Sequence, residues 1–338
     1  MSSVYSVVRI RSGLSALILV AHPKRVKFLV IPFRARRSIL IFLTILPLTG
    51  CLFRSRKVQP PLTTAQLKTA SLRELVNYLN TQASKIQTVQ ATVNIDTSLG
   101  GEKKGKVTDY QEIRGYVMTR KPSMLRLVGL MPIVRNRAFD MVSDGERFEL
   151  WIPPKNRFVV GRNDVETHNP QQPLENLRPQ TIYDSLLLRP VDPDNEIAVI
   201  RTQTDYLTDS KGHRLPQADY VVDVIRKGKR GWFLAREIAF SRADLLPHRQ
   251  ILYDENGNVT TNAVYEGYRP ENGINFPWQI EIAWPQEEYD ITLTLVKLDL
   301  NQPLPDDKFV LEQPPGVEVI HLDKPEASPS SLSPASDR

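Results

Sequence analysis

The chain has 338 residues, with 44 lysine and arginine residues against 38 aspartate and glutamate residues, which gives a net charge of +6. Eight of the basic residues and none of the acidic ones lie in residues 1–50, so 36 basic and 38 acidic residues follow, a net charge of −2. This balance excludes the basic excess that nucleic-acid-binding domains show. Cys51 is the single cysteine, which excludes a disulfide within the chain and a metal site built from several thiolates.

The first 50 residues have the pattern of a secretory signal. A basic cluster of Arg34, Arg36 and Arg37 precedes the apolar run Ile39–Leu48, and small residues follow before Cys51. The run is too short to span a membrane comfortably, since a transmembrane helix needs about 20 apolar residues. Residues 1–33 carry a second apolar run and more basic residues. We interpret them either as an unusually long n-region or as the result of a start codon assigned too far upstream.

The sequence Leu48-Thr49-Gly50-Cys51 resembles the lipobox of bacterial lipoproteins, in which a small residue directly precedes an acylated cysteine. This resemblance implies cleavage after Gly50, lipidation of Cys51 and stable anchoring through acyl chains. Leu52 rather than aspartate follows Cys51, which resembles lipoproteins that well-studied Gram-negative bacteria send to the outer membrane. The alternative is a short buried or membrane helix with a chance cysteine.

Two helices are predicted. After a tether at residues 51–65, which contains Pro60-Pro61 and shows no periodicity, Ser71 and Glu74 form a capping-box pattern. A second helix is predicted to begin at Pro179 and to end before Pro190, with Ile182 and Leu186 on its apolar side. The first helix has a single apolar stripe and therefore packs against an apolar surface on one side. This stripe consists of Leu72, Leu75, Val76, Leu79, Ala83 and Ile86.

Most of the remaining chain alternates apolar and polar residues with a period of two, which predicts β-strands. Asp144-Gly145 lies between two such runs and predicts a tight hairpin. Sequential strands at hairpin spacing favour an antiparallel meander. The expected strands lie near residues 91–99, 108–119, 124–128, 135–142, 147–152, 157–161, 196–207, 219–226, 232–242, 249–253, 259–268, 274–284 and 289–300.

The stretch Ile274–Trp284 has a large apolar side chain at every second position, and its other face is polar. One face of this strand therefore lies against something apolar. We take its apolar residues as candidates for the lining of a cavity, namely Phe276, Trp278, Ile280, Ile282 and Trp284. Residues 301–322 contain several prolines and predict no regular structure, and the Pro- and Ser-rich residues 323–338 are predicted to be disordered.

These elements predict an α+β fold that is mainly antiparallel β. A sheet of about ten to twelve strands tends to curl or close, and two amphipathic helices are available to cover its apolar face. We therefore expect an incomplete or curled β-barrel over residues 66–322, with both helices on its concave face. A wide sheet covered by only two helices can leave an apolar cavity, as larger barrels do.

The order of these features resembles the LolA/LolB-type superfamily of lipoprotein carriers and outer-membrane lipoprotein receptors. The resemblance rests on Cys51, the long first helix, the meander, the helix near mid-chain and the motif Pro305-Asp306-Asp307-Lys308-Phe309, and it covers roughly residues 66–315. It implies a hydrophobic cavity that takes the acyl chains of lipoproteins or phospholipids. The lipid anchor is closer to the receptors than to the soluble carrier, whereas the chain is longer than a usual receptor.

The almost wholly apolar stretch 127–134 lies between two predicted strands. Receptors of this superfamily have a protruding loop with an exposed leucine there, so the resemblance implies a tip that touches the membrane or the acyl chains. Leu130, Met131 and Ile133 are our candidates. The alternative is that these residues continue a buried strand, because Gly129 and Pro132 indicate a bend but not exposure.

Other motifs do not predict an active site. The run Gly100–Lys106 matches a phosphate-binding loop, but Val107 stands where Ser or Thr is needed and no helix follows. The five histidines show no paired ligand spacing, and no nucleophile motif is present. Arg226, Lys227, Lys229 and Arg230 are more typical of a solvated turn than of a headgroup site. We therefore predict no catalytic residue, no cofactor and no metal.

The sequence thus predicts a non-enzymatic lipoprotein anchored through Cys51 to the inner leaflet of the outer membrane, facing the periplasm. It would bind acyl chains and aid lipoprotein or lipid transfer to that membrane, with a periplasmic carrier as a partner and no nucleic acid. The alternative is an envelope-assembly scaffold that binds a protein through its sheet edges or outer face. An enzyme on the same scaffold is the third hypothesis, and no cluster of acid, base and nucleophile in the sequence favours it.

Overall fold

The computed structural model describes residues 67–322, apart from residues 102–104, 165–177, 209–211 and 213. Residues 61–338 form one compact unit, which contains all of the described elements. The lipobox Leu48–Cys51, the tether and the C-terminal tail lie outside the described residues and stay predictions.

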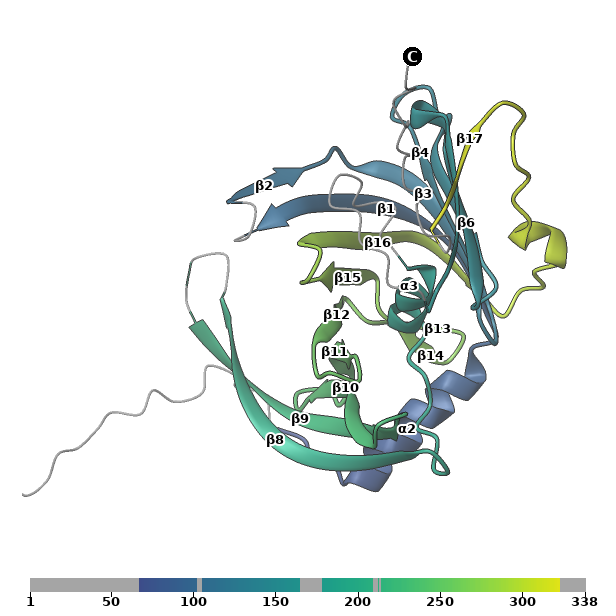
Figure 1. Cartoon of the computed structure of the whole chain (residues 1–338). Helices are drawn as coiled ribbons and strands as arrows, with labels where there is room; N and C mark the ends of the chain where they lie inside the picture. The colour runs from purple at the N-terminus through teal and green to yellow at the C-terminus, as the bar shows by residue number, and fades with distance from the viewer. Residues whose placement is uncertain (1–66, 102–104, 165–177, 209–211, 213, 323–338) are drawn as a thin grey trace, which may run out of the picture. The chain divides into compact units, whose positions relative to one another are not determined.

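Fifteen strands form one sheet that curls round without closing (Figure 1), because its strand order has two separate ends, β17 and β8, among the described residues. The order is β17-β7-β6-β5-β4-β3-β1-β16-β15-β12-β11-β10-β9-β8, with β2 beside β1 and with β13–β14 as a separate hairpin. The β17–β7 pair is parallel and the other described pairs are antiparallel. The strands are β1 (Thr88–Gly101), β2 (Lys106–Asp109), β3 (Ile113–Arg120), β4 (Met124–Leu130), β5 (Arg137–Ser143), β6 (Arg147–Ile152), β7 (Arg157–Arg162), β8 (Glu196–Thr208), β9 (Arg214–Lys227), β10 (Trp232–Ser241), β11 (Pro247–Tyr253), β12 (Val259–Glu266), β13 (Arg269–Glu271), β14 (Ile274–Phe276), β15 (Gln279–Trp284), β16 (Tyr289–Leu300) and β17 (Glu318–His321).

Both helices lie on the same, concave face of this sheet. Helix α2 (Leu72–Lys85) buries Leu75 and Leu79 against β9 and β10, and the backbone oxygen of Asp184 on α3 (Pro179–Leu186) accepts a hydrogen bond of 3.0 Å from the Gln250 side chain. Residues that pair directly across strands share a face, and one row of them connects the two helix contacts with the middle of the sheet. This row is Val222, Ile238, Gln250, Ala263, Ile282, Ile291 and Thr97. The fold class predicted from the sequence is thus confirmed.

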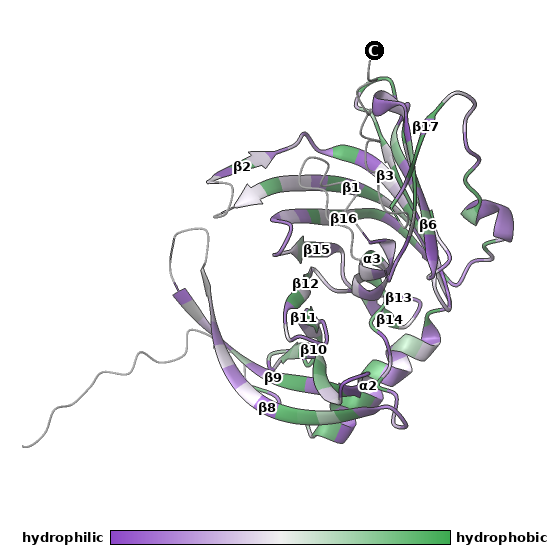
Figure 2. Ribbon diagram, viewed as in Figure 1, coloured by the Kyte–Doolittle hydropathy of each residue, from purple (hydrophilic) through white to green (hydrophobic). Residues whose placement is uncertain are grey.

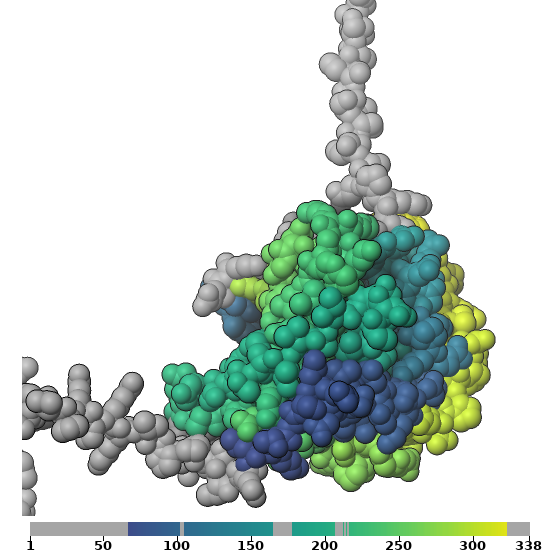
Figure 3. Space-filling model, turned by 90° about the horizontal axis from the view of Figure 1, so that it is seen from below, coloured from purple at the N-terminus to yellow at the C-terminus, as the bar shows by residue number. Residues whose placement is uncertain are grey.

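The sequence determines where α2 begins. The Ser71 hydroxyl accepts a hydrogen bond of 3.3 Å from the Glu74 backbone N–H, and the Ser71 backbone N–H donates to the Glu74 carboxylate at 2.7 Å. This is the predicted capping box, which satisfies two backbone donors of the first turn. In Figure 3 the outer side of α2 (purple) forms part of the surface, as its single apolar stripe requires.

The main core lies between α3 and the sheet, where buried side chains of β1, β3–β7, β12 and β14–β16 meet Ile182 and Leu186. Figure 2 shows the alternation of hydrophobic and hydrophilic residues along the strands that supplies this face.

A buried ion pair fixes the chain after α3. Arg236 on β10 is 1% exposed and donates to the carbonyl oxygens of Arg189 at 2.7 Å and Pro190 at 2.8 Å and to the Glu196 carboxylate at 3.2 Å. Burial lowers the pKa of Arg236 to about 10.

The C-terminal segment after β16 crosses the convex face of β4–β7 and ends as β17 beside β7 (Figure 1). Arg126 on β4 donates to the carbonyl oxygen of Lys308 at 2.9 Å, within the short helix η4 (Asp306–Phe309), and Leu311 is buried against Val142 and Phe158. The sequence predicts no regular structure for residues 301–322. The structure instead contains β17 in this segment. The sequence does not reveal this strand because it is only four residues long and its partner, β7, lies far away in the sequence.

The predicted strand Ile274–Trp284 is divided. Pro277, which has no N–H to donate, separates β14 from β15. Strand β14 instead forms a hairpin with β13, and its turn residues Asn272 and Gly273 have positive φ angles of 50° and 75°. Several short strands that the sequence does not separate raise the number of strands above the expected ten to twelve.

Candidate functional site

An apolar cavity of about 540 Å³ lies on the concave face of the sheet, and no residue of α3 lines it. We call it the main cavity. Along β1 burial is strong up to Ile95 and weaker from Asp96 onward, so the core gives way to the cavity within one strand. The cavity is therefore the part of the apolar face that α3 leaves uncovered. Its lining consists of Thr97, Leu99, Tyr110, Gln111, Ile113, Leu127, Pro132, Ala138, Phe139, Met141, Leu150, Ile152, Lys155, Tyr289 and Ile291.

The wall of the main cavity is made of aliphatic and aromatic side chains with few polar groups. Lys155 is the one charged residue among the described lining residues. Tyr289 is buried, and burial raises the pKa of its hydroxyl above the ordinary value, so it is neutral at physiological pH. Gly129 gives Phe139 its position, because a Cβ atom at Gly129 would lie 2.4 Å from the Phe139 ring. Such a lining suits an apolar ligand without a buried charge.

A turn between β4 and β5, residues Met131–Asn136, carries apolar side chains into solvent. We call it the tip loop. Ile133 is 98% exposed, Val134 64% and Met131 37%. The loop is nevertheless closed by backbone hydrogen bonds, from the Met131 N–H to the Asn136 oxygen at 2.7 Å and from the Arg135 N–H to the Met131 oxygen at 3.1 Å. The exposed apolar surface is thus held in a defined turn.

The backbone of the tip loop is strained at Ile133. Its φ angle is +69°, and the Val134 N–H donates to the Pro132 oxygen at 2.8 Å across it. A β-branched residue rarely adopts positive φ because its side chain then crowds the backbone. Pro132, beside it, lines the main cavity, and so do Ala138 and Phe139 of the next strand. The tip loop therefore stands at the rim of the main cavity.

The three residues predicted for a membrane-touching tip lie in or next to the tip loop. Leu130 is half-buried at the end of β4, whereas Met131 and Ile133 belong to the loop itself. The beginning of the stretch does continue a buried strand, since Leu127 is 1% exposed. Whether these residues touch a membrane stays a prediction.

None of the five residues predicted to line a cavity lines the main cavity. Ile280, Ile282 and Trp284 are buried in the main core, and the Trp278 ring lies 4.1 Å beneath the guanidinium carbon of Arg269. Phe276 lines a different and much smaller cavity. Sequence reasoning missed the lining of the main cavity. The alternation that places Leu99 and Ile113 on an apolar face is visible in the sequence. The sequence does not show how far α3 extends, and therefore which part of the apolar face of the sheet stays uncovered.

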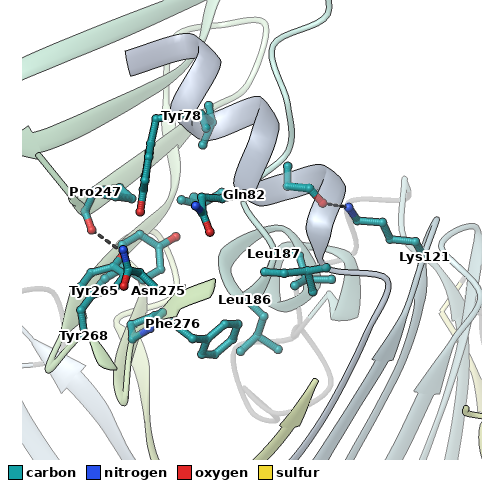
Figure 4. Close-up of a pocket in the computed structure, with 15 residues that line it drawn as sticks. Tyr78, Gln82, Lys121, Leu186, Leu187, Pro247, Tyr265, Tyr268, Asn275 and Phe276 are labelled. Carbon is teal, nitrogen blue, oxygen red and sulfur yellow. Dashed lines mark hydrogen bonds between the residues drawn. The ribbon is translucent and has the colours of Figure 1, made fainter. Parts of the chain in front are cut away.

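The second cavity, of about 50 Å³, lies between α2, the end of α3, β12 and β14 (Figure 4). We call it the tyrosine cavity. Gln82 reaches from α2 to the side on which the tyrosine rings lie, and Lys121 donates to the Ala83 carbonyl oxygen at the C-terminal end of α2 (Figure 4). The Tyr268 hydroxyl donates to the Pro247 oxygen at 2.6 Å. The lining is Tyr78, Leu79, Gln82, Ala83, Ile86, Lys121, Leu186, Leu187, Leu188, Pro247, Tyr265, Tyr268, Asn275, Phe276 and Pro277.

Within the described part of the chain, no group of three or more His, Cys, Asp or Glu residues could hold a metal ion. The described helices include none with the length and apolar character needed to cross a membrane.

No family model and no curated protein match the chain. Solved structures do show a likeness. A LolA superfamily protein from Nitrosomonas europaea is 11% identical, with a TM-score of 0.44 over 72% of this chain and 99% of that one. A DUF1329 family protein from Desulfovibrio piger is 14% identical, with a TM-score of 0.44 over 72% and 98%.

An outer membrane lipoprotein-sorting protein domain from Vibrio parahaemolyticus is 10% identical, with a TM-score of 0.39 over 71% and 97%. The superfamily that the sequence pattern resembles is therefore present among these structures. Identities and TM-scores this low transfer none of those proteins' properties to this chain.

Proposed function

We propose that this chain is a lipid-anchored periplasmic lipoprotein that takes an acyl chain of a lipoprotein or lipid into the main cavity and helps it reach the outer membrane. The observation that carries the proposal is the apolar cavity of about 540 Å³ with an exposed apolar loop at its rim. This volume falls within the roughly 300–1,000 Å³ of typical small-molecule pockets, which suits one acyl chain rather than several.

The energy of such binding comes from burial. Each buried methylene contributes about 0.8 kcal/mol, so ten of them contribute roughly 8 kcal/mol, which corresponds to a dissociation constant of about 1 μM before the costs of association. Because the lining is apolar, the acyl chain can bind without any charged contact. Affinity of this order would let the cargo be released at a membrane, where its chain finds an equally apolar environment.

Binding is tested on residues 61–338, the compact unit that contains all described core clusters. A fluorescent fatty acid should bind this unit, and Ala138→Trp, which places a large ring in the main cavity, should weaken binding at least about tenfold. Ala243→Trp is the matched control, because Ala243 lies exposed in a turn away from the cavity. Absence of binding, or equal binding by both variants, would refute the proposal.

The tip loop would bring the rim of the cavity to the membrane. Full burial of an isoleucine side chain is worth about 1.5–3 kcal/mol, so Ile133→Asn should reduce cosedimentation of the unlipidated unit with vesicles roughly tenfold or more. Asparagine tolerates the positive φ at this position. Val310→Asn serves as the control, since Val310 is 58% exposed but lies on the convex face. If both variants sediment like the parent chain, the tip loop has no such role.

The anchor itself is a separate part of the proposal. Cys51→Ser should abolish labelling of the chain by a radioactive fatty acid in a Gram-negative host and should release the chain from the outer-membrane fraction. A chain that is still labelled would rule out Cys51 as the lipidated residue.

A non-catalytic assembly scaffold is the second candidate, and the free edge of β8 favours it. This strand has 13 residues and, among the described strands, β9 as its single neighbour, and its Ile197 and Val199 are 50% and 46% exposed. An open edge can accept a strand of a partner. Native mass spectrometry separates the candidates, because a unit without bound lipid that also fails to take up acyl chains would favour the scaffold.

A further inference from the structure

The tyrosine cavity contains two buried polar atoms that the described residues leave without a hydrogen bond. Tyr265 on β12 is 3% exposed and lines this cavity, and its hydroxyl has no partner among the described residues. The Gln82 side-chain oxygen on α2 is also buried and without a partner. An unsatisfied buried polar atom costs about 1–3 kcal/mol, and buried polar atoms are paired in the great majority of cases. Two of them around one cavity therefore point to a ligand.

Three other polar side chains of the cavity are already engaged. The Tyr268 hydroxyl donates to the Pro247 oxygen, Lys121 donates to the Ala83 oxygen, and Tyr78 shares a hydrogen bond with Asn275. A ligand would thus meet the Tyr265 hydroxyl as a donor and the Gln82 oxygen as an acceptor, both buried and without a partner among the described residues. Burial raises the pKa of Tyr265, so its hydroxyl keeps its proton and donates.

The charges around the cavity exclude an ionic ligand. No carboxylate is among the described lining residues, so a cation would be buried without a counter-ion. Lys121 is the single charged residue in the described part of the lining, and burial lowers the pKa of its amine. Its bond to the Ala83 oxygen holds it at the end of α2, so an anion would not find a free cation either.

We infer that the tyrosine cavity binds a neutral, hydroxyl-bearing small molecule or lipid end, which donates to Gln82 and accepts from Tyr265. One hydroxyl group does both. The volume of about 50 Å³ holds about four water-sized groups, which limits the inserted part to a short alcohol. Leu79, Ile86 and Phe276 supply apolar walls for its carbon atoms.

The experiment titrates residues 61–338 with 1-propanol while the side-chain amide of Gln82 is followed by NMR, with 1-fluoropropane as a probe of similar shape that lacks the O–H donor. Saturable shifts with 1-propanol and a roughly tenfold weaker effect of 1-fluoropropane are expected. Tyr265→Phe should weaken 1-propanol binding roughly tenfold. Tyr78→Phe is the matched control, because the Tyr78 hydroxyl lines the same cavity but already bonds Asn275.

Equal effects of the two probes would show an apolar hole without a hydroxyl site, and equal binding by the Tyr265→Phe variant would show that its hydroxyl is not the donor. Either result, or the absence of saturation, overturns the inference. The circular dichroism spectrum of each variant confirms that it is folded. The inference is independent of the proposed function, since the two cavities share no described lining residue and acyl binding can succeed or fail separately.

Discussion

Ile133 combines almost complete exposure with a strained backbone. A residue that is 98% exposed gains nothing from burial within the chain, yet its φ angle of +69° costs a β-branched residue energy that glycine avoids. Strain of this kind, of order 1–3 kcal/mol, persists only where the surrounding structure enforces it. Here the tip-loop hydrogen bonds do so, which is consistent with a side chain that must point away from the protein.

Replacement of this residue should therefore stabilise the fold. Ile133→Gly relieves the positive φ and loses no buried surface, so the free energy of unfolding in urea should rise by up to about 1 kcal/mol, reduced somewhat by the greater freedom of glycine in the unfolded chain. Val134→Gly is the control, because the φ of Val134 is not positive. A loss of stability in Ile133→Gly equal to that of the control would contradict the assignment of strain.

Asp184 is the second residue whose environment has a measurable consequence. It lies 7% exposed on α3, and burial raises the pKa of its carboxyl above 3.8, although Arg189, Gln180 and Arg236 act in the opposite direction. Ionisation of this carboxyl group is therefore less favourable in the folded state than in the unfolded state. Its contribution to stability is highest below pH 3.8 and falls as the pH rises through the folded pKa.

Asp184→Asn removes that dependence, so the substitution should be more favourable for stability at pH 7 than at pH 3.5, as measured by urea unfolding at both pH values. Asp192→Asn should show the opposite dependence of stability on pH, because the hydrogen bond from the Asn195 side chain lowers the pKa of Asp192. That substitution should be more costly at pH 7 than at pH 3.5. The same sign for both variants would be incompatible with these environments.

At the scale of elements, the two helices differ in how they are specified. Helix α2 has a capping box and an apolar stripe in its own sequence. Helix α3 has eight residues, no side-chain cap and six buried residues, among them Asp184 and Ser185. An isolated helix of that length is unstable in water, so α3 depends on the sheet and on contacts such as the bond from the Trp284 indole to Thr181 at 3.0 Å.

Ser71→Ala should lower the free energy of unfolding by about 1 kcal/mol, because the Glu74 N–H loses its acceptor. Ser84→Ala, in the last turn of the same helix, is the control, since its hydroxyl only donates to the Thr81 oxygen. Thermal unfolding of both variants measures the difference. Equal losses would mean that the capping box does not stabilise the folded chain.

The elements that could be predicted are those whose signal is local. The capping box at Ser71, the turn at Asp144-Gly145 and the period of two along β1 each depend on neighbouring residues, and the structure has all three. Strand β17 could not be predicted, because its pairing with β7 is set by a distant segment. The break at Pro277 had a local signal, the missing N–H, which the strong alternation around it obscured.

The candidate site was predictable only in part for the same reason. The apolar stretch that holds Ile133 is visible in the sequence, and its exposure follows from the turn that the chain makes after β4. The lining of the main cavity combines residues from β1, β3–β6 and β16. No single segment identifies it, since it lies where α3 does not cover the sheet.

At the scale of the whole molecule, the pairing of β1 with β16 holds the sheet together. Strands β3–β7 and β17 lie on one side of this pair and β8–β12 and β15 on the other, so this is the one link within the sheet between the two halves described. Helix α3 forms a second connection, because it packs on β4, β5 and β15. Contacts this distant in sequence are slow to form during folding, but once made they couple both halves.

Leu293→Ala tests this coupling. Leu293 on β16 is fully buried and pairs with Ile95 on β1 and Ile280 on β15, so its truncation should lower the free energy of unfolding by about 2–5 kcal/mol. Because α3 still joins the halves, unfolding should remain one transition, with the same midpoint by tryptophan fluorescence and by far-ultraviolet circular dichroism. Val296→Ala, in the same strand but 44% exposed, should change stability by less than about 0.5 kcal/mol. Two separate transitions in Leu293→Ala would mean that each half folds independently and that α3 does not connect them.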